Sequence, residues 1–377
     1  MSFHRDLDRR LRGLRAHLDR VSRRRGALPA PQVLVRAPGV EFSYGDRAKP
    51  FHSASVGKVM TTTLIGRLVE QGRLALDTPI GTVLPGSEVA GLPAAPGVDV
   101  GADVTIERLL THTSGLPDFF EPPRGSGSAA SITGAVSDPD RRWTPSALLD
   151  EARAMPAVGR PGERFHYCDT GFVVLGRVVE EVTGDPFNTV LRQQVLEPAG
   201  MARSSTPYGD AVAPGELAGL EVAPFWIGRR ELSRALCVSL DWAGGGIVGP
   251  PEDFVAFQQA LHSGQLISPT LLAHLARPRR RRRPGLHYGA GLVTIRFHEF
   301  FPVGLANLPQ PVGGVGAFAT HMFHYPQQQA HVVINFHGTQ QMQASFQTHC
   351  RIAMVLRGLT IDAPIGDQLF TPVPSPQ

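Results

Sequence analysis

Segments with strand-like sequence lie near the two ends of this 377-residue chain, and segments with helical periodicity fill its middle. Residues 32–46 contain two short apolar runs joined by Pro38-Gly39, a pattern typical of a β-hairpin. Three more runs rich in β-branched and aromatic residues follow at 288–297, 316–326 and 330–338. The two groups of strands can share one sheet only if the two ends of the chain lie side by side and the helical middle forms a separate insertion. We therefore predict an α/β (α+β) fold, an antiparallel sheet flanked by helices with an inserted all-helical domain.

This pattern predicts two domains with a site between them. The sheet domain would be discontinuous and comprise residues 1–60 and 285–377, and the mainly helical domain would comprise residues 61–284. Apolar residues from Phe3 to Val21 recur every three or four positions, which indicates an amphipathic helix with an arginine-rich outer face. Further helices are predicted at 55–74, 105–110, 145–154, 171–183, 187–197, 251–262 and 341–357.

The composition is typical of a globular protein. Hydrophobic residues make up 42% and charged residues 19%, and the formal net charge is only +4. These values exclude a disordered chain and give no reason to expect nucleic-acid binding. We find no signal-peptide core and no apolar run of about 20 residues, so we expect a cytoplasmic protein without a membrane segment. The three cysteines are far apart and have neither disulfide nor zinc spacing.

Two polar segments are predicted to be loops. Residues 121–143 are long, polar and rich in Gly, Ser and Pro, which favours a surface loop, with a lid as the alternative. The run Arg279–Arg283 lies between Pro278 and Pro284 and is interpreted as a solvated loop, although such a run could also bind phosphates.

A possible nucleophile and base stand three residues apart at the start of a predicted helix. Ser55-Val56-Gly57-Lys58 matches the pattern S-x-x-K, and residues at i and i+3 share a helix face. A serine hydroxyl needs a neighbouring base, and lysine can be that base once its pKa is lowered from about 10.4. The chain has 35 arginines but only two lysines, Lys49 and Lys58. Because arginine cannot act as a base near neutral pH, the lysine at this position favours catalysis over a surface role.

The motifs that follow Ser55 occur in a recognisable order. They are GRLVEQGRLALDTPIGTVLP, VTIERLLTHTSGLPDF, PGERFHYCDTGFVVLGRVVEEVTGDPF, VLEPAGM and WAGGGIVGPPEDFVAF. Together they resemble the penicillin-binding-protein and class C β-lactamase family of serine hydrolases from about residue 32 to residue 340. The resemblance implies an active site between a sheet domain and a helical domain. It also implies acyl-enzyme chemistry at Ser55 and Lys58 without a cofactor or a metal.

Tyr167-Cys168-Asp169 occupies the position of the family's Y-x-N motif. By this resemblance Tyr167 would relay protons, as a phenolate stabilised by the lysine charge. Asp169 replaces the usual Asn and is expected to keep Lys58 protonated, which favours Tyr167 as the base. Cys168 is adjacent, but we find no histidine base for a thiol nucleophile and do not assign it one. His112, in THTSGLP, is interpreted as structural.

The third motif of the family departs most from the pattern. Where the family carries K-T-G or H-x-G, this chain has Pro311-Val312-Gly313-Gly314-Val315, so the basic position falls on Pro311 or Val312. Without that cation, moving a substrate carboxylate from water into the pocket costs more free energy. Activity as a β-lactamase or on D-Ala-D-Ala peptides is therefore less expected than activity on a neutral acyl group. The glycines leave space for the backbone N–H of Val315 to form an oxyanion hole with that of Ser55.

Histidines cluster near the predicted last strands, at His321, His324, His331 and His337. Their placement on both faces of a sheet and their irregular spacing indicate ordinary strand histidines, and no metal site is predicted.

The sequence thus predicts a serine hydrolase with carboxylesterase-like activity on a small-molecule ester or amide. Two alternatives remain, namely an acyltransferase of a biosynthetic pathway and a non-catalytic relative that binds a ligand. The sequence leaves the oligomeric state open.

Overall fold

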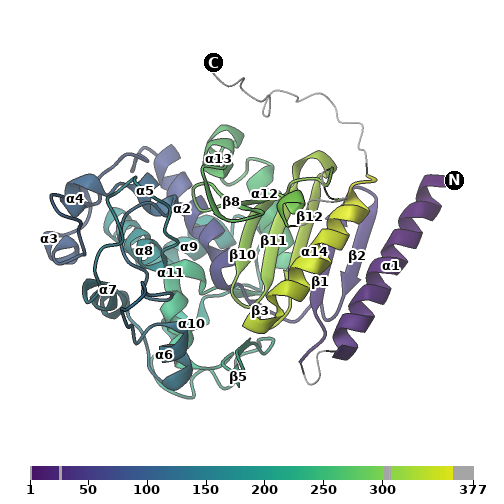
Figure 1. The fold of residues 1–377 in the computed structure, drawn as a ribbon, viewed down its shortest axis with the longest axis horizontal. Helices are drawn as coiled ribbons and strands as arrows, with labels where there is room; N and C mark the ends of the chain where they lie inside the picture. The colour runs from purple at the N-terminus through teal and green to yellow at the C-terminus, as the bar shows by residue number, and fades with distance from the viewer. Residues whose placement is uncertain (1, 25–27, 301–304, 306, 360–377) are drawn as a thin grey trace.

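The computed structural model describes residues 2–24, 28–300, 305 and 307–359, and no side chain before residue 6 (Figure 1). The side chain of Phe3 and residues 360–377 of the predicted sheet domain therefore lie outside the described residues. Within the described part, no helix is long and apolar enough to cross a lipid bilayer.

An eight-stranded sheet joins the two ends of the chain. Its strand order is β2-β1-β12-β11-β10-β9-β8-β7, and every neighbouring pair is antiparallel. The strands are β1 (Gln32–Ala37), β2 (Val40–Tyr44), β7 (Arg280–Arg283), β8 (Leu286–Tyr288), β9 (Val293–Ile295), β10 (Val312–Gly316), β11 (Thr320–Tyr325) and β12 (Ala330–Asn335). The pairing of β1 with β12 brings the N-terminal hairpin beside the C-terminal strands, as the sequence predicted.

Helices cover both faces of the sheet, and alternate side chains of the strands separate the two layers. Val332 and Ile334 of β12 pack in the core that contains α1 (Ser2–Arg24) and α14 (Met342–Leu356). Val333 between them faces the other way, into the core that includes α2 (Gly57–Glu70) and α12 (Pro251–His262). Figure 1 shows α14 lying in front of the central strands and α1 at the outer edge.

The middle of the chain is mainly helical and lies beside the β10 side of the sheet (Figure 1). Its helices are α3 (Gly86–Val89), α4 (Val100–Asp103), α5 (Ile106–Leu110), α6 (Ile132–Ser137), α7 (Pro145–Arg153), α8 (Asp169–Thr183), α9 (Phe187–Leu191), α10 (Pro207–Asp210), α11 (Trp242–Gly245) and α13 (Pro269–Ala276). Two short ribbons pair β3 (Phe51–His52) with β6 (Val248–Gly249), and β4 (Trp226–Ile227) with β5 (Arg230–Glu231). Helix α12 and strand β7 fall within residues 61–284 and are nevertheless part of the sheet layer.

Both segments predicted to be loops differ from that expectation. The loop prediction is wrong for Arg280–Arg283, which form the edge strand β7 paired with β8. An edge strand tolerates charged side chains because one of its sides faces solvent, and this explains a strand made of four arginines. Residues 121–143 are not wholly a surface loop, since they contain α6 and bury Ala130, Ala135 and Trp143.

The strand histidines lie on both faces of the sheet, as predicted. His324 and His331 are paired across β11 and β12, and His262 of α12 stacks on His324 at 3.9 Å between ring centroids. On the opposite face, His321 contacts Ser345 and His349 of α14. No group of three His, Cys, Asp or Glu side chains in the described ranges is arranged to hold a metal ion.

The stack of His262, His324 and His331 should make the fold sensitive to acid. Burial lowers their pKa values to about 3, 2 and 4. In the unfolded chain, these groups would titrate near 6.5. The folded state therefore binds fewer protons below that pH, and stability is lost as the pH falls from about 6.5 toward 4. We expect the free energy of unfolding to fall by up to about 1.4 kcal/mol per pH unit for each histidine.

Urea unfolding of wild type and His324→Leu between pH 4 and 8 measures this effect. The variant should show a shallower loss of stability in acid, whereas replacing His298, outside the stack, should leave the slope unchanged. Equal slopes in all three proteins would contradict this interpretation.

Candidate active site

Ser55 lies on a tight 3₁₀ turn, Ala54–Val56, which runs directly into α2. Ala54 has a φ of 48°, a left-handed conformation that is costly for a residue other than glycine. The turn is held from its other side by Gly245, where a Cβ would come within 2.1 Å of the Ala54 carbonyl oxygen. The Ser53 hydroxyl also donates a hydrogen bond of 2.5 Å to the carbonyl of Gly245. This close backbone packing fixes the position of Ser55.

Lys58 is buried beside Ser55, as the S-x-x-K spacing predicted. Its Nζ lies 3.3 Å from Ser55 Oγ and 2.9 Å from the carbonyl oxygen of Gly244, and it donates a short hydrogen bond to Asp169 Oδ1. These three acceptors match the three donors of an ammonium group. Burial opposes the charge on Lys58, but Asp169 and the other polar neighbours outweigh it and raise the pKa above its ordinary value. Lys58 is therefore an ammonium in the resting protein.

Asp169 begins α8 and joins the two parts of the site. Its backbone N–H donates a hydrogen bond of 2.8 Å to Oδ1 of Asp118. Burial, followed by the charge of Asp169, raises the pKa of Asp118 to about 7. Asp118 lies within the motif THTSGLPDF, but the sequence alone predicts no role for it. The position of Asp169 agrees with the expectation that it keeps Lys58 protonated.

The dependence of Lys58 on Asp169 can be tested directly because the chain has only two lysines. We expect the Lys58 side-chain signal of ¹³C-lysine-labelled protein to remain that of an ammonium up to about pH 10. In Asp169→Asn, burial is no longer offset by this anion, and the pKa of Lys58 should fall below the ordinary value of about 10.4. A Lys49→Arg variant assigns the two signals. An unchanged Lys58 titration in Asp169→Asn would refute this account of its charge.

Tyr167 faces the lysine with its ring. The Lys58 Nζ lies 5.4 Å from the ring centroid, and the ring of His112 stacks on Tyr167 at 4.4 Å. Among the hydrogen bonds of the described residues, none joins the Tyr167 hydroxyl to Ser55 or Lys58. Burial raises the pKa of Tyr167, and Lys58 offsets this only in part. The prediction of a stabilised phenolate is therefore wrong for this state, and Tyr167 holds its proton.

His112 and Cys168 take supporting positions. The His112 Nδ1 accepts a hydrogen bond of 3.2 Å from the backbone N–H of Cys168, and burial lowers the pKa of the His112 imidazole well below its usual value. Cys168 is buried, and burial raises the pKa of its thiol well above the ordinary range. A thiol that stays protonated is a poor nucleophile.

Arg282 is a site neighbour that sequence reasoning missed. Its guanidinium lies 4.1 Å from the centroid of the Tyr167 ring, and it forms a 2.9 Å ion pair with Glu121. The arginine run signalled charge, but only the pairing of β7 with β8 places this one side chain over the tyrosine.

Strand β10 brings the glycines of the third motif against the Ser55 turn. A Cβ on Gly314 would lie 3.0 Å from Val59 Cγ2 and 3.4 Å from Val56 Cα. A Cβ on Gly316 would lie 2.7 Å from the carbonyl oxygen of Ser53. The strand can approach the Ser55 turn this closely only because Gly314 and Gly316 have no side chains. On its other side, the register pairs Val312 and Gly313 with β9.

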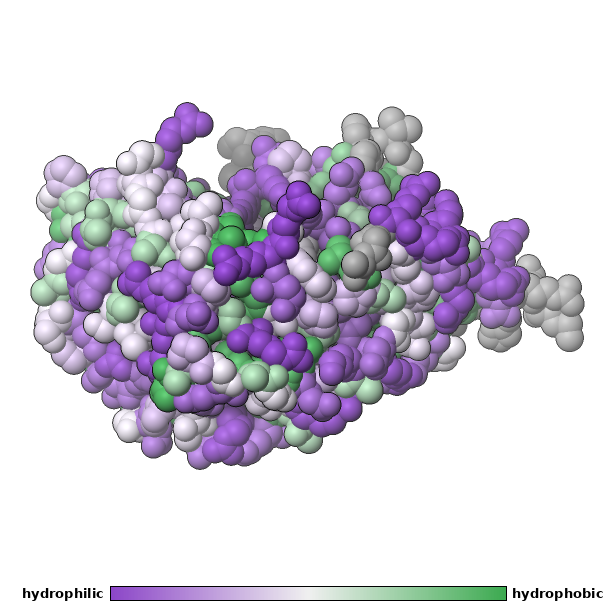
Figure 2. Space-filling view, turned by 90° about the horizontal axis from the view of Figure 1, so that it is seen from below, coloured by the Kyte–Doolittle hydropathy of each residue, from purple (hydrophilic) through white to green (hydrophobic). Residues whose placement is uncertain are grey.

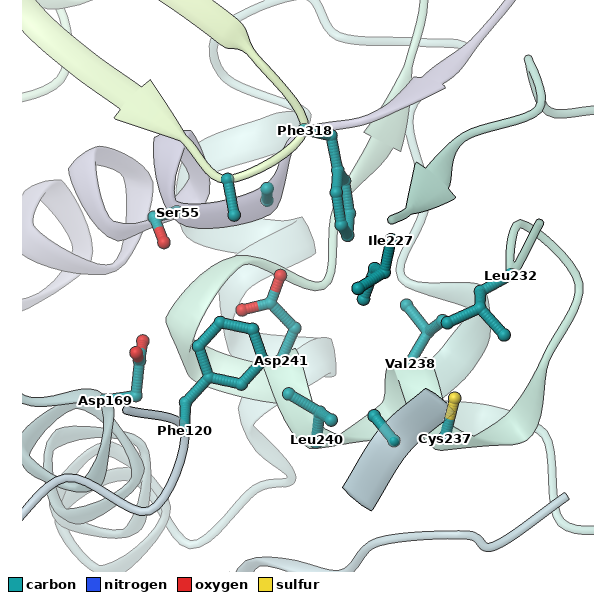
Figure 3. A pocket seen from close by; sticks show the side chains of 13 residues that line it. Ser55, Phe120, Asp169, Ile227, Leu232, Cys237, Val238, Leu240, Asp241 and Phe318 are labelled. Carbon is teal, nitrogen blue, oxygen red and sulfur yellow. The ribbon is translucent and has the colours of Figure 1, made fainter. Parts of the chain in front are cut away.

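A narrow cavity opens beside Ser55 (Figure 3). Its volume is about 30 Å³. Ser55 and the carboxyl groups of Asp169 and Asp241 lie toward one end, and the rest is mainly apolar. The other lining residues are Ala54, Phe120, Ala135, Ile227, Leu232, Cys237, Val238, Leu240, Ala317 and Phe318. Seen from below, apolar residues gather toward the middle of the molecule, between hydrophilic surfaces (Figure 2).

Of the residues predicted for the site, Ser55 and Asp169 line this cavity and Lys58 contacts both. Tyr167 lies beside Lys58, and Val312, Gly313, Gly314 and Val315 lie on the adjacent β10; none of these five lines the cavity. Asp241 was missed because an aspartate before WAGGG has no motif of its own. Only the folded structure shows that its carboxyl group lines the same cavity as Ser55.

Comparisons with known proteins show which family this chain is similar to. The family model described as Beta-lactamase matches residues 30–353. Penicillin-binding protein 4 of Amycolatopsis lactamdurans is 36% identical over 207 residues, covering 52% of this chain and 48% of that protein. Esterase EstB of Burkholderia gladioli is 29% identical over 255 residues, covering 60% of each chain. The chain thus spans about half to three fifths of the length of these relatives.

Among solved structures, EstCE1, described as a hydrolase with promiscuous acyltransferase activity, superposes with a TM-score of 0.71. The match covers 94% of this chain and 99% of that one at 20% sequence identity, which shows a shared fold. Because the family model covers most of the sequence, the chain belongs to the Beta-lactamase family.

Proposed function

We propose that this chain hydrolyses an ester or amide of an acyl group without a carboxylate, through an acyl-enzyme on Ser55. The observation that carries the proposal is the 3.3 Å contact between Lys58 Nζ and Ser55 Oγ, at the end of a cavity with apolar walls. The esterase EstB relative supports an ester as the substrate. A relative is named penicillin-binding protein 4, but this chain has Pro311 or Val312 at the position where a cation for a substrate carboxylate is expected.

In the resting site Lys58 is an ammonium, so the reaction would begin in the minor population in which Lys58 has released its extra proton to solvent. Ser55 Oγ then bonds to the carbonyl carbon, and its proton passes to Lys58 Nζ. The backbone N–H groups of Ser55 and Val315 would donate hydrogen bonds to the resulting oxyanion. The protonated Tyr167 hydroxyl is suited to give its proton to the leaving group, and Lys58 would then return the serine proton to Tyr167. In the second half of the reaction, water would give a proton to Lys58 as its oxygen bonds to the acyl carbon. The Ser55–acyl bond would then break, and Ser55 Oγ would take that proton back from Lys58.

The test is turnover of an activated ester of a short neutral acid, such as p-nitrophenyl butyrate, with benzylpenicillin as the carboxylate-bearing comparison. We expect turnover of the ester and a transient butyryl adduct in the intact mass, and much slower acylation by the penicillin. Ser55→Ala is the blank. Faster acylation by benzylpenicillin, or no ester turnover above the blank, would overturn the proposal.

Acyl transfer is a second candidate, favoured by the fold shared with EstCE1 and its described acyltransferase activity. The same acyl-enzyme can react with an alcohol or an amine in place of water. Product analysis with added alcohols separates the two outcomes, because a hydrolase releases only the free acid.

A further inference from the structure

We propose that Arg282 is a positioning residue for Tyr167, and that its fixed positive charge over the tyrosine ring promotes transfer of the phenol proton to the leaving group. The inference rests on the proposed acyl-enzyme function and adds to it a residue that acts on the acid of that reaction. The guanidinium of Arg282 lies 4.1 Å from the centroid of the Tyr167 ring. At this distance a cation is attracted to the ring and stabilises negative charge that develops on it.

A β-bulge directs Arg282 toward the site. On strand β7, Arg281 and Arg283 pair with consecutive residues of β8, so Arg282 is an extra residue between them. An extra residue of this kind bends the strand and changes the direction of its side chain. The side chain of Arg282 is 29% exposed, against 61% for that of Arg281. One arginine of the run thus lies over Tyr167, while its neighbour remains in solvent.

Glu121 orients the guanidinium. Arg282 Nη2 donates a hydrogen bond of 2.9 Å to Oε2 of Glu121. The backbone N–H of Glu121 in turn donates one of 2.9 Å to Oδ2 of Asp118, the aspartate that accepts a hydrogen bond from the Asp169 backbone. The ion pair is partly exposed, so it contributes little to stability. Its consequence is that the guanidinium is held in place and already has an anionic partner, which makes it a poor site for a substrate carboxylate.

The Tyr167 ring is also held by neutral neighbours. The ring of His112 stacks on it with centroids 4.4 Å apart, and the ring of Tyr288 meets it edge-on at 5.9 Å. Burial lowers the pKa of His112 well below its usual value, so this imidazole is uncharged. Among the described residues, the cations within about 6 Å of the Tyr167 ring centroid are Lys58 at 5.4 Å and Arg282 at 4.1 Å.

The two cations differ in whether they keep their charge during the reaction. Burial raises the pKa of Tyr167, and the charges of Lys58 and Arg282 lower it. Lys58 would lose its extra proton, take up that of Ser55 and pass it on, so its charge beside the ring changes from step to step. Arginine keeps its proton at every accessible pH.

The step on which Arg282 acts is the departure of the leaving group. The bond between the acyl carbon and the leaving oxygen breaks, and the proton of the Tyr167 hydroxyl passes to that oxygen, which leaves as an alcohol. Tyr167 is then a phenolate until Lys58 returns the serine proton to it. The charge of Arg282 would stabilise this phenolate from its formation to its reprotonation.

The experiment compares kcat/KM for methyl butyrate and p-nitrophenyl butyrate in wild type, Arg282→Gln, Arg282→Lys and Arg281→Gln. The two esters share an acyl group, but only the methyl ester needs a proton on its leaving group, so the ratio of the two values reports on the acid. We expect this ratio, methyl over p-nitrophenyl, to fall about tenfold in Arg282→Gln, because a weaker acid loses part of the about 10² to 10⁴ that acid catalysis contributes.

Two further variants separate charge from structure. Arg282→Lys keeps the positive charge and should retain more than about a third of the wild-type ratio, whereas Arg281→Gln removes a neighbouring surface charge and should leave the ratio within about twofold. Because Arg282 is partly exposed on an edge strand, Arg282→Gln is expected to fold, and circular dichroism confirms this.

A ratio within about threefold of wild type in Arg282→Gln would overturn the proposal while leaving ester hydrolysis intact. Equal falls in Arg282→Gln and Arg281→Gln, or in Arg282→Gln and Arg282→Lys, would also contradict it. If Arg282→Gln slows acylation by benzylpenicillin and leaves the ester ratio unchanged, Arg282 binds a substrate carboxylate instead. Absence of turnover of both esters by wild type would count against the proposed function itself.

Discussion

Lys58→Arg is expected to lower kcat/KM for p-nitrophenyl butyrate by about 10³-fold or more. General base catalysis typically contributes about 10² to 10⁴ in rate, and arginine keeps its proton at every accessible pH. The variant keeps a positive charge beside Asp169, so the ion pair at the base of the site is preserved while the base is lost. Activity is measured between pH 6 and 9, with circular dichroism to confirm the fold.

Lys49→Arg is the matched control because it changes the other lysine in the chain, outside the site. This control should retain wild-type kcat/KM within about twofold, the range expected for surface substitutions. If Lys58→Arg keeps more than a tenth of wild-type activity, the lysine acts through its charge and not as a base.

Tyr167→Phe should have an effect that depends on the leaving group. The raised pKa of Tyr167 keeps the phenol protonated, which suits it to donate a proton to a departing alkoxide. For a methyl ester, whose leaving group needs that proton, we expect kcat/KM to fall by about 10² to 10⁴-fold. For a p-nitrophenyl ester of the same acid, whose leaving group departs as an anion, the loss should be less than about tenfold.

Tyr288→Phe offers a control for the loss of a nearby hydroxyl, since its ring centroid lies 5.9 Å from that of Tyr167. It should affect the two esters equally. Equal losses for both esters in Tyr167→Phe would assign Tyr167 to the attack of Ser55, or to the structure, instead of to the leaving group.

The sequence predicted the architecture because apolar residues recur at helical spacing in the helices and form short runs bounded by turn residues in the strands. The hairpin at Pro38-Gly39, the amphipathic N-terminal helix and the last two predicted strands, β11 and β12, occur where predicted. The first predicted strand, 288–297, is wrong as a single strand, because it contains only the end of β8 and, after a break, β9. The strand made of Arg280–Arg283 could not be foreseen, because residues that favour solvent carry no period-2 apolar signal. Its place at the sheet edge depends on pairing with β8, the next strand in the sequence, which is mostly buried whereas β7 is mostly exposed.

The site shows the same division between local and tertiary information. The contact of Ser55 with Lys58 follows from helix spacing alone, and the sequence predicted it. The charge of Lys58 depends on Asp169, 111 residues away, and on burial. No sequence motif marks Asp241 or Arg282. Asp241 is brought to the cavity beside Ser55, and Arg282 to the ring of Tyr167, only by the tertiary fold. The raised pKa of Tyr167 also reflects burial, which the sequence does not report.

Labelling with a fluorophosphonate, followed by intact mass and peptide mapping, tests the central claim most directly. The account predicts one adduct, located on Ser55, that forms rapidly in wild type, forms at least about 10²-fold more slowly in Lys58→Arg and does not form in Ser55→Ala. An adduct on another residue, or labelling of Ser55 at equal rates with and without Lys58, would contradict it.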